Sequence, residues 1–320
     1  MGLQGVYSPH MPLAQEVLRG DFLALGRAIS LVESGSSEGR RLLEEVSGSI
    51  GRALRIGITG PPGVGKSTSI DELSSAYRAR GEKVAVIAVD PTSPFTGGAL
   101  LGDRIRMTKS TETEDVFMRS MATRGTSGGL ARATQDAADL LDAAGRSVIL
   151  LETVGVGQSE VDISKAADCV IVMLSPESGD GIQAMKSGVL EIADIVVINK
   201  ADRAGADRLE HDLRTAFELG LRSRGEIPIL LTEANRGKGI PELMAAIDGF
   251  ISTRRAGSGF RERRRRNLEN RIKGIAEFLI QKDLWESDGS QGRVDASVER
   301  VMAGQSPYAS ARQLLDEVSR

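Results

Sequence analysis

Apolar residues in the middle of the chain form short, nearly continuous runs, separated by longer stretches in which apolar residues recur at helical spacing. The runs are rich in Val and Ile and have the length of strands buried on both faces. They lie at residues 56–59, 84–89, 147–151, 169–174, 195–198 and 227–231. The intervening stretches predict helices over 66–80, 128–144, 181–192 and 207–219. Alternation of this kind predicts an α/β fold, with a mainly parallel sheet flanked by helices.

Both ends of the chain show helical spacing instead. Residues 1–52 predict a helical N-terminal arm, with Asp21 as the N-cap of one helix. Residues 53–250 would form the central domain, and residues 251–320 a helical C-terminal extension. In that extension Leu268, Ile272, Ile275 and Leu279 form an apolar seam, and Ser306–Pro307 predicts the start of a last helix. The seam could close on the chain's own domain or on a second copy.

The first strand run ends in a glycine-rich turn that opens a helix. Gly60, Gly65, Lys66 and Ser67 match the spacing G-x-x-x-x-G-K-[ST] of the phosphate-binding loop. Glycines let backbone N–H groups curl around an anion, and the helix that follows directs its positive dipole end at the same phosphates. We expect Lys66 to reach the β- and γ-phosphates and the Ser67 hydroxyl to bind Mg²⁺. The loop residues predicted to contact nucleotide are Gly60, Pro61, Pro62, Gly63, Val64, Gly65, Lys66, Ser67 and Thr68.

A second motif, Asn199-Lys200-Ala201-Asp202, follows the fifth run and fits N-K-x-D. A carboxylate held edge-on accepts hydrogen bonds from N1–H and the exocyclic amine of guanine, whereas adenine would leave it unpaired. In register with a phosphate loop, the motif therefore favours GTP over ATP. The stretch Thr232-Glu233-Ala234 is expected to line the base from the other side.

Acidic residues stand where the predicted strands end, on the side of the phosphate loop. Glu152 is a candidate to hold Mg²⁺ directly or through water, and the N–H of Gly155 can meet the γ-phosphate. Asp90 and Asp103 are further candidates for binding metal or positioning water, and the stretch between them resembles a mobile switch. The chemistry that these groups predict is phosphoryl transfer to water.

Two further stretches predict loops, and one predicts a charged surface. Residues 178–181 (SGDG) together with Lys186 suggest a flexible loop near the nucleotide. Residues 119–129 (RSMATRGTSGG) suggest a loop that closes on phosphate or on a partner. We interpret the basic run at 261–266 as a solvated helix face, with a partner's acidic surface as the alternative.

Composition limits the partners. A net charge of −3 and an aromatic content of 3% argue against nucleic acid and against a membrane surface. The single cysteine, Cys169, excludes a disulfide within one chain, and the two histidines lie too far apart to form a spaced metal-ligand set. The sequence has no signal-peptide pattern and no apolar stretch of membrane-spanning length, so the expected location is cytoplasmic.

Taken together, the motifs resemble those of the MeaB-type GTPases, also named ArgK or LAO/AO transport kinases. The resemblance rests on GPPGVGKST, VDPTSPFTGGALLGDRIRM, ETVGVGQSE, SGDGIQAMKSG and NKAD, within residues 60–202. It implies a P-loop GTPase that binds GTP, GDP and Mg²⁺ and is a chaperone of the cobalamin-dependent enzyme methylmalonyl-CoA mutase. It also implies slow intrinsic hydrolysis that the partner stimulates, and a homodimer formed through the C-terminal helices.

The resemblance also implies roles for single residues. Lys66 and Ser67 would hold phosphate and Mg²⁺, and Asp202 would read guanine. The acids of the metal and switch region would be Asp90, Asp103 and Glu152. Asp180 and Lys186 would belong to switch III, a mobile loop tied to stimulation by the partner. The base-lining stretch Thr-Glu-Ala-Asn departs from the Ser-Ala type that is usual in the family.

Two other functions compete with a GTP-driven chaperone. A metal-insertion GTPase for a nickel enzyme would need Cys or His ligands at the metal handover. An ATP-dependent small-molecule kinase would need a second substrate pocket and tolerance of adenine, against which NKAD argues. Which acyl-CoA mutase is the partner, methylmalonyl-CoA, isobutyryl-CoA or another, stays open.

Overall fold

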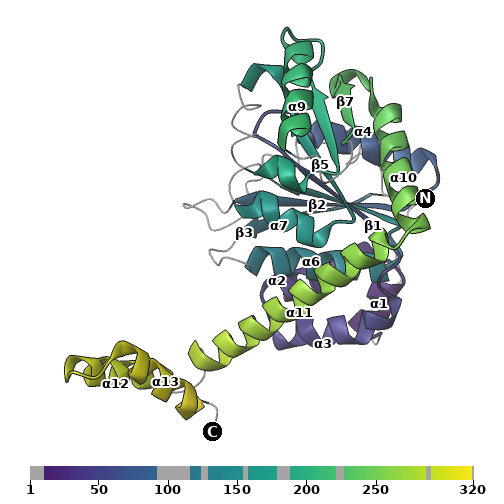
Figure 1. Ribbon diagram of the computed structural model, residues 1–320. Coiled ribbons are helices and arrows are strands. Elements are labelled where there is room, and N and C mark those ends of the chain that lie inside the picture. The colour runs from purple at the N-terminus through teal and green to yellow at the C-terminus, as the bar shows by residue number, and fades with distance from the viewer. Residues whose placement is uncertain are drawn as a thin grey trace. The chain divides into compact units, whose positions relative to one another are not determined.

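The first unit of the protein is built on a parallel sheet (Figure 1). The computed structural model describes residues 11–91, 116–123, 129–153, 158–178, 188–220, 227–285 and 290–318. The chain divides into two compact units, with the boundary after Arg265. Within the described residues the sheet has seven strands, all parallel, in the order β3-β2-β4-β1-β5-β6-β7. They are β1 Leu54–Thr59, β2 Val84–Pro91, β3 Phe117–Thr123, β4 Val148–Thr153, β5 Cys169–Leu174, β6 Ile195–Asn199 and β7 Ile229–Thr232. The predicted α/β fold is confirmed.

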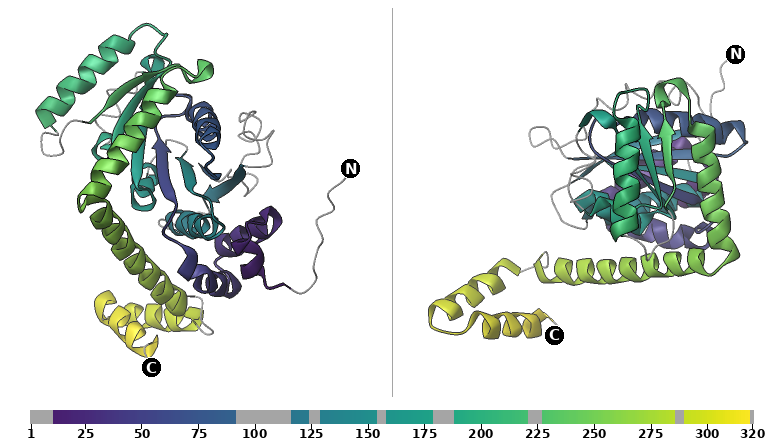
Figure 2. Two further views of the ribbon diagram at one scale, coloured as in Figure 1. Left: turned by 90° about the vertical axis from the view of Figure 1, so that its right-hand side faces the viewer. Right: turned by 45° about the horizontal axis from the view of Figure 1, so that its top comes forward.

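Helices cover both faces of this sheet (Figure 2). One face carries α4 Lys66–Ala79 and α10 Ile240–Ala256, and the other carries α6 Gly129–Ala143, α7 Gln158–Ala166 and α9 Ala206–Gly220. The helices α1 Leu13–Leu18, α2 Phe22–Glu33 and α3 Ser37–Val46 pack against α6. Asp21 caps α2 as predicted, since its Oδ1 accepts the N–H of Ala24 at 2.7 Å. Short 3-10 turns complete the unit: η1 Ser47–Ser49, η3 Pro176–Ser178, η4 Val189–Ile192 and η6 Ala234–Arg236.

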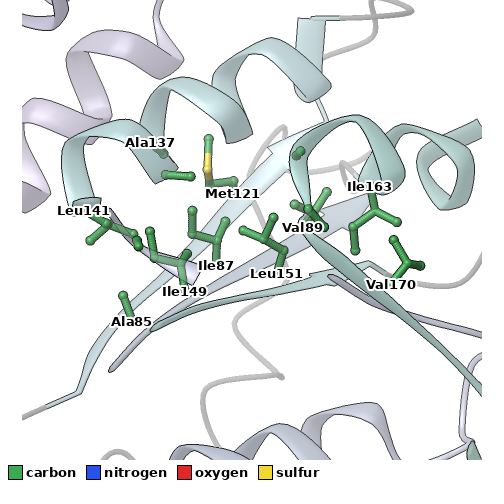
Figure 3. Close-up of a cluster of buried hydrophobic side chains, with 14 of the residues drawn as sticks. Ala85, Ile87, Val89, Met121, Ala137, Leu141, Ile149, Leu151, Ile163 and Val170 are labelled. Atoms are coloured by element: carbon green, nitrogen blue, oxygen red, sulfur yellow. The ribbon is translucent and has the colours of Figure 1, made fainter. Parts of the chain in front are cut away.

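The apolar runs of the sequence become strands buried on both faces. In β2, Ile87 and Val89 face α6 and α7 (Figure 3). Val84 and Val86 of the same strand belong to the core on the opposite face. Every residue of β4, β5 and β6 is buried. Each fully buried Ile, Leu or Val contributes roughly 1.5–3 kcal/mol of transfer free energy, so continuous runs of these residues hold the sheet between its two helical layers.

One predicted element was wrong in its described part, and a second can be followed only in part. Residues 119–123 belong to strand β3 rather than to a loop, and β3 pairs with β2 at the edge of the sheet. The polar residues that suggested a loop have partners in the fold, because Arg119 pairs with Glu33 and donates to Ser30 Oγ at 3.0 Å. Of the helix predicted over 181–192, residues 181–187 lie outside the described residues, and Val189–Ile192 form a 3-10 turn.

The amino ends of the central strands are tied together by charged side chains. Asp142 accepts the backbone N–H groups of Gly51, Arg52 and Ala53 at 2.7, 3.2 and 3.0 Å. From the other side, Arg264 donates to the carbonyl oxygens of Gly51 and Ala53 at 2.5 and 2.7 Å. The segment that leads into β1 is therefore bound on both sides.

The basic run at 261–266 supplies this contact, and the expectation of a solvated helix face was wrong for two of its arginines. Arg264 also binds both carboxylate oxygens of Asp168 at 2.7 Å, in a bidentate pair. Although burial alone would lower the pKa of Arg264, its hydrogen bonds to Asp168 keep that pKa above the ordinary value. Arg263 donates to Asp194, just before β6, at 2.5 Å. A helical wheel could not reveal these pairs, because Asp168 and Asp194 lie just before β5 and β6, far from the helix in the sequence.

The second unit, from Arg266 onward, contains most of α11 Gly259–Trp285, together with α12 Ser290–Met302 and α13 Pro307–Val318. The helices α12 and α13 pack together, and Ser310 Oγ donates to the carbonyl oxygen of Ser297 at 3.0 Å. Along α11, Leu268, Ile272 and Leu279 of the predicted seam are 54%, 66% and 42% exposed. In the described part of the chain, no helix has the length and apolar character needed to cross a membrane.

Candidate nucleotide-binding site

The predicted phosphate loop lies between the carboxyl end of β1 and the start of α4, the edge where ligands bind in parallel α/β sheets. Its glycines are required by the geometry. Gly60 has a φ of +142°, and a Cβ there would lie 2.0 Å from the carbonyl oxygen of Met173. Gly65 has a φ of +96°, and its Cβ would lie 2.3 Å from Asn199 Nδ2. Any side chain at either position would displace β5 or Asn199.

Lys66 and Ser67 open α4 and point their polar atoms back into the loop region. Lys66 Nζ donates to the carbonyl oxygens of Gly60 and Pro61 at 2.8 and 2.9 Å, and Lys66 is 7% exposed. Ser67 Oγ donates to Glu152 Oε1 at 2.8 Å. The structure thus brings together three predicted site residues from two strand ends: an ammonium, a hydroxyl and a carboxylate beside an open helix N-terminus.

Asn199 connects the phosphate loop to the stretch predicted to line the base. Its Nδ2 donates to the carbonyl oxygen of Val64 at 2.8 Å, and its Oδ1 accepts from Thr232 Oγ1 and Ala234 N–H, both at 3.0 Å. The backbone N–H of Ala234 can only donate, so it fixes which end of the amide is the oxygen. The two predicted nucleotide-binding segments are therefore joined through one buried side chain.

The rest of the N-K-x-D motif forms a tight turn after β6. The N–H of Ala201 donates to the carbonyl oxygen of Thr232 at 3.0 Å, and Asp202 is exposed. Lys200 has a φ of +58°, the left-handed region that residues with a side chain seldom adopt. The Glu233 carboxylate accepts hydrogen bonds from Lys238 Nζ at 2.9 Å and from Arg236 Nη1 at 2.8 Å. These hydrogen bonds lower the pKa of Glu233.

Other predicted residues can be placed only in part. Asp90 is the second-last residue of β2 at the same edge, two residues beyond Ala88, which is in register with Glu152 on β4. The remaining ones, Gly155, Asp103, Asp180 and Lys186, lie outside the described residues. Sequence reasoning missed Glu177 and Arg203, which contact the N-K-x-D turn. Their position just beyond buried strands was the one signal that could have found them.

The donor set is compatible with Mg²⁺. Mg²⁺ prefers oxygen ligands and keeps waters and substrate phosphates among them. One hydroxyl and one nearby carboxylate are therefore sufficient as its protein ligands. Ser67 and Glu152 offer such a pair. No group of three or more His, Cys, Asp or Glu side chains gathers as a metal site within the part of the chain that the structure describes.

A phosphate loop at the central strand, a Ser–Glu pair beside it and an N-K-x-D turn on the same sheet edge define a P-loop GTPase. The profile of one family, described as "Methylmalonyl Co-A mutase-associated GTPase MeaB", matches residues 25–288. The chain belongs to the MeaB family, as the sequence motifs predicted, and it is a GTPase that binds GTP and GDP.

Relatives extend over most of the chain. A protein of Pyrococcus abyssi is 44% identical over 311 residues, covering 96% of each chain. The GTPase ArgK of Escherichia coli is 37% identical over 250 residues, 74% of this chain and 76% of its own. The mouse protein named methylmalonic aciduria type A homolog, mitochondrial, is 36% identical over 73% of this chain and 61% of its own. A solved structure described as LAO/AO transport system kinase has a TM-score of 0.71 and 27% identity, covering 96% of this chain and 97% of that one.

Proposed function

We propose that this GTPase is a chaperone that gates cofactor loading or protection of a cobalamin-dependent acyl-CoA mutase. The observation that carries the proposal is the MeaB family match over residues 25–288, since that family's description associates the GTPase with methylmalonyl-CoA mutase. The name of the mouse relative agrees with it. A GTPase serves such a role by using the γ-phosphate to shift the population of its loops, so that nucleotide state controls what the partner can bind.

In this proposal each of the described site residues has a separate role in phosphoryl transfer. Lys66 exchanges its two backbone carbonyl partners for the β- and γ-phosphates, and neutralises charge that develops during transfer. Ser67 and Glu152 would hold Mg²⁺, which would supply positive charge to the phosphates. Asp202 reads guanine, and the backbone N–H groups of residues 63–68 bind the phosphates.

Five further residues take part in the proposal only through the family resemblance. Asp90 and Asp103 would complete the metal and switch region. Asp180 and Lys186 would respond to the mutase, and the N–H of Gly155 would meet the γ-phosphate. Alanine substitution of Lys186 tests this directly, since it should leave unstimulated GTP hydrolysis in place and remove most of the stimulation by a mutase.

We further propose that the C-terminal extension, taken from residue 251, forms a homodimer. Leu268, Ile272 and Leu279 expose an apolar stripe of the kind that monomers usually cover. Replacing Ile272 by Glu should convert a dimer to a monomer in sedimentation equilibrium, while Lys273→Glu, at the neighbouring exposed position, should not. A wild-type chain that sediments as a monomer would contradict the proposal.

The competing functions gain no support. A metal-insertion GTPase needs an accessible thiol or imidazole set, but Cys169 is fully buried in β5 and burial raises the pKa of its thiol. An ATP-dependent kinase would need a carboxylate-free adenine site, whereas Asp202 lies at the carboxyl end of the sheet in an N-K-x-D turn.

The decisive experiment is steady-state hydrolysis of GTP, with ATP as the control nucleotide, in the presence and absence of purified cobalamin-dependent mutases. Methylmalonyl-CoA mutase and isobutyryl-CoA mutase are tested separately, and a cobalamin-independent acyl-CoA enzyme serves as the protein control. Stimulation of GTP turnover by one mutase and not by the control is the expected result. GTP turnover that no mutase changes would overturn the chaperone role, and preferred turnover of ATP would overturn the assignment of Asp202.

A further inference from the structure

One carboxylate holds both ends of the turn that carries Asp202. Glu177 Oε2 accepts from Lys200 Nζ at 3.0 Å, and Glu177 Oε1 accepts from Arg203 Nη1 at 2.7 Å. Lys200 and Arg203 flank Asp202 in the sequence, and the N–H of Arg203 donates to the carbonyl oxygen of Lys200 at 2.9 Å to close the turn. The turn is thus fixed through its side chains as well as its backbone.

The turn needs such support because its backbone is unusual. A left-handed φ of +58° at Lys200 is unfavourable for a residue with a side chain, and it persists only where surrounding contacts determine it. The N–H of Ala201 is held by β7 through Thr232. Glu177 supplies the restraint from the other side, since it lies in η3 directly after β5, and β5 is the neighbour of β6 in the sheet.

The carboxyl group of Glu177 is ionised at neutral pH. A hydrogen bond from Lys200 lowers the pKa of this carboxyl, and the nearby charge of Arg203 acts in the same direction. The group is therefore ionised throughout the neutral range, and both of its pairs persist there.

We propose that Glu177 and Arg203 are positioning residues for guanine recognition: together they hold the 200–203 turn so that Asp202 meets the base edge-on. The inference rests on the proposed role of Asp202 as the residue that reads guanine. Neither residue belongs to the N-K-x-D motif, so the inference adds two residues to those that determine base choice.

The test compares Glu177→Gln, Arg203→Gln and the double variant in the full-length chain, with the affinities for GDP and IDP measured by competition. IDP lacks the exocyclic amine, so the ratio of the two affinities reports how well a carboxylate faces that amine. Each single variant should bind GDP about three- to tenfold more weakly and lose part of its preference for GDP over IDP. The double variant should be no weaker than the weaker single variant, because both changes remove one shared contact.

A matched control is Glu210→Gln, which breaks a comparable exposed pair with Arg214 on α9, away from the turn. It should leave both affinities unchanged. The side chains of Glu177 and Arg203 are 40% and 58% exposed, so their variants should fold normally.

Three results would overturn the inference. Unchanged affinities and an unchanged GDP to IDP ratio in both single variants would show that the contact does not position Asp202. Losses that add in the double variant would show that Glu177 and Arg203 act separately. Asp202→Asn is measured in parallel: if it gains xanthosine nucleotides while the other variants behave like wild type, only this inference fails, and if it does not, the proposed guanine reading fails with it.

Discussion

Removal of the Asn199 side chain should destabilise the GTPase unit and loosen the phosphate loop at the same time. Asn199 is 4% exposed and makes three hydrogen bonds, one to the carbonyl oxygen of Val64 and two from Thr232 and Ala234. A buried hydrogen bond contributes about 1 kcal/mol net. Asn199→Ala should therefore lower the free energy of unfolding by about 3 kcal/mol, with little scope for water to replace the lost contacts.

A second substitution measures how much one of the three hydrogen bonds contributes to this loss. Thr232→Val keeps the volume and removes one donor, while Asn199 Oδ1 keeps the N–H of Ala234 as its partner. It should cost about 1 kcal/mol, roughly a third of the effect of Asn199→Ala. Asn235→Ala, an exposed asparagine in the adjacent turn, is the matched control and should stay within about 0.5 kcal/mol of wild type.

The assay is urea unfolding of the nucleotide-free chain, followed by circular dichroism and by the reactivity of Cys169. The thiol is fully buried at the start of β5, so its exposure reports opening of the GTPase unit itself. Asn199→Ala should also weaken GDP binding, because Val64 loses its tether to the base-lining segment. The reasoning would be refuted if Asn199→Ala were within 1 kcal/mol of wild type, or if Thr232→Val cost as much as Asn199→Ala.

Three other substitutions and one labelling measurement test separate parts of the structure. Lys66→Ala removes the ammonium at the phosphate loop and should weaken GTP binding more than about 100-fold in equilibrium titration, so nanomolar affinity in this variant would contradict the loop assignment. Asp202→Asn should let xanthosine triphosphate compete with GTP, because an amide donor replaces a carboxylate oxygen; unchanged base preference would mean that Asp202 does not read the base. Arg264→Gln leaves Asp168 buried without its bidentate partner and should cost on the order of 3 kcal/mol in urea unfolding, whereas the exposed Arg265→Gln should cost little. Cys169 should resist thiol reagents at pH 8 in the folded chain, since burial raises its pKa and reduces the thiolate; labelling faster than unfolding would contradict this burial.

Much of the fold could be predicted because the local pattern and the final environment agree. Strands β4, β5 and β6 are apolar throughout and buried on both faces, so their runs were visible without any knowledge of neighbours. Strand β3 lies at the edge and contains Arg119, whose partner on α2 is 86 residues away. A strand residue that is polar because it pairs with a distant part of the chain cannot be distinguished from a loop residue in the sequence.

The candidate site shows the same division. The phosphate loop is continuous in sequence, and its spacing is dictated by the phosphates themselves, so Lys66 and Ser67 could be predicted from the motif. Glu177 could not be found in this way, because its role depends on two cations 23 and 26 residues away. Pairs that form between neighbouring strand ends have no fixed spacing, since loop lengths set it.

The carboxyl edge and the amino edge of the sheet have different roles. At the carboxyl edge the polar groups face an open helix N-terminus, and they can exchange protein partners for a nucleotide. At the amino edge, Arg264 and Asp168 are each satisfied within the fold, and their bonds fix the start of β1. Substitutions at the amino edge should therefore change stability and leave base preference intact, because they alter no group that meets the ligand. Asn199 is the residue that belongs to both categories, since its amide stabilises the unit and joins the phosphate loop to the base-lining segment. Substitution of Asn199 should consequently lower both the free energy of unfolding and the nucleotide affinity, whereas substitutions at either edge should lower mainly one of the two.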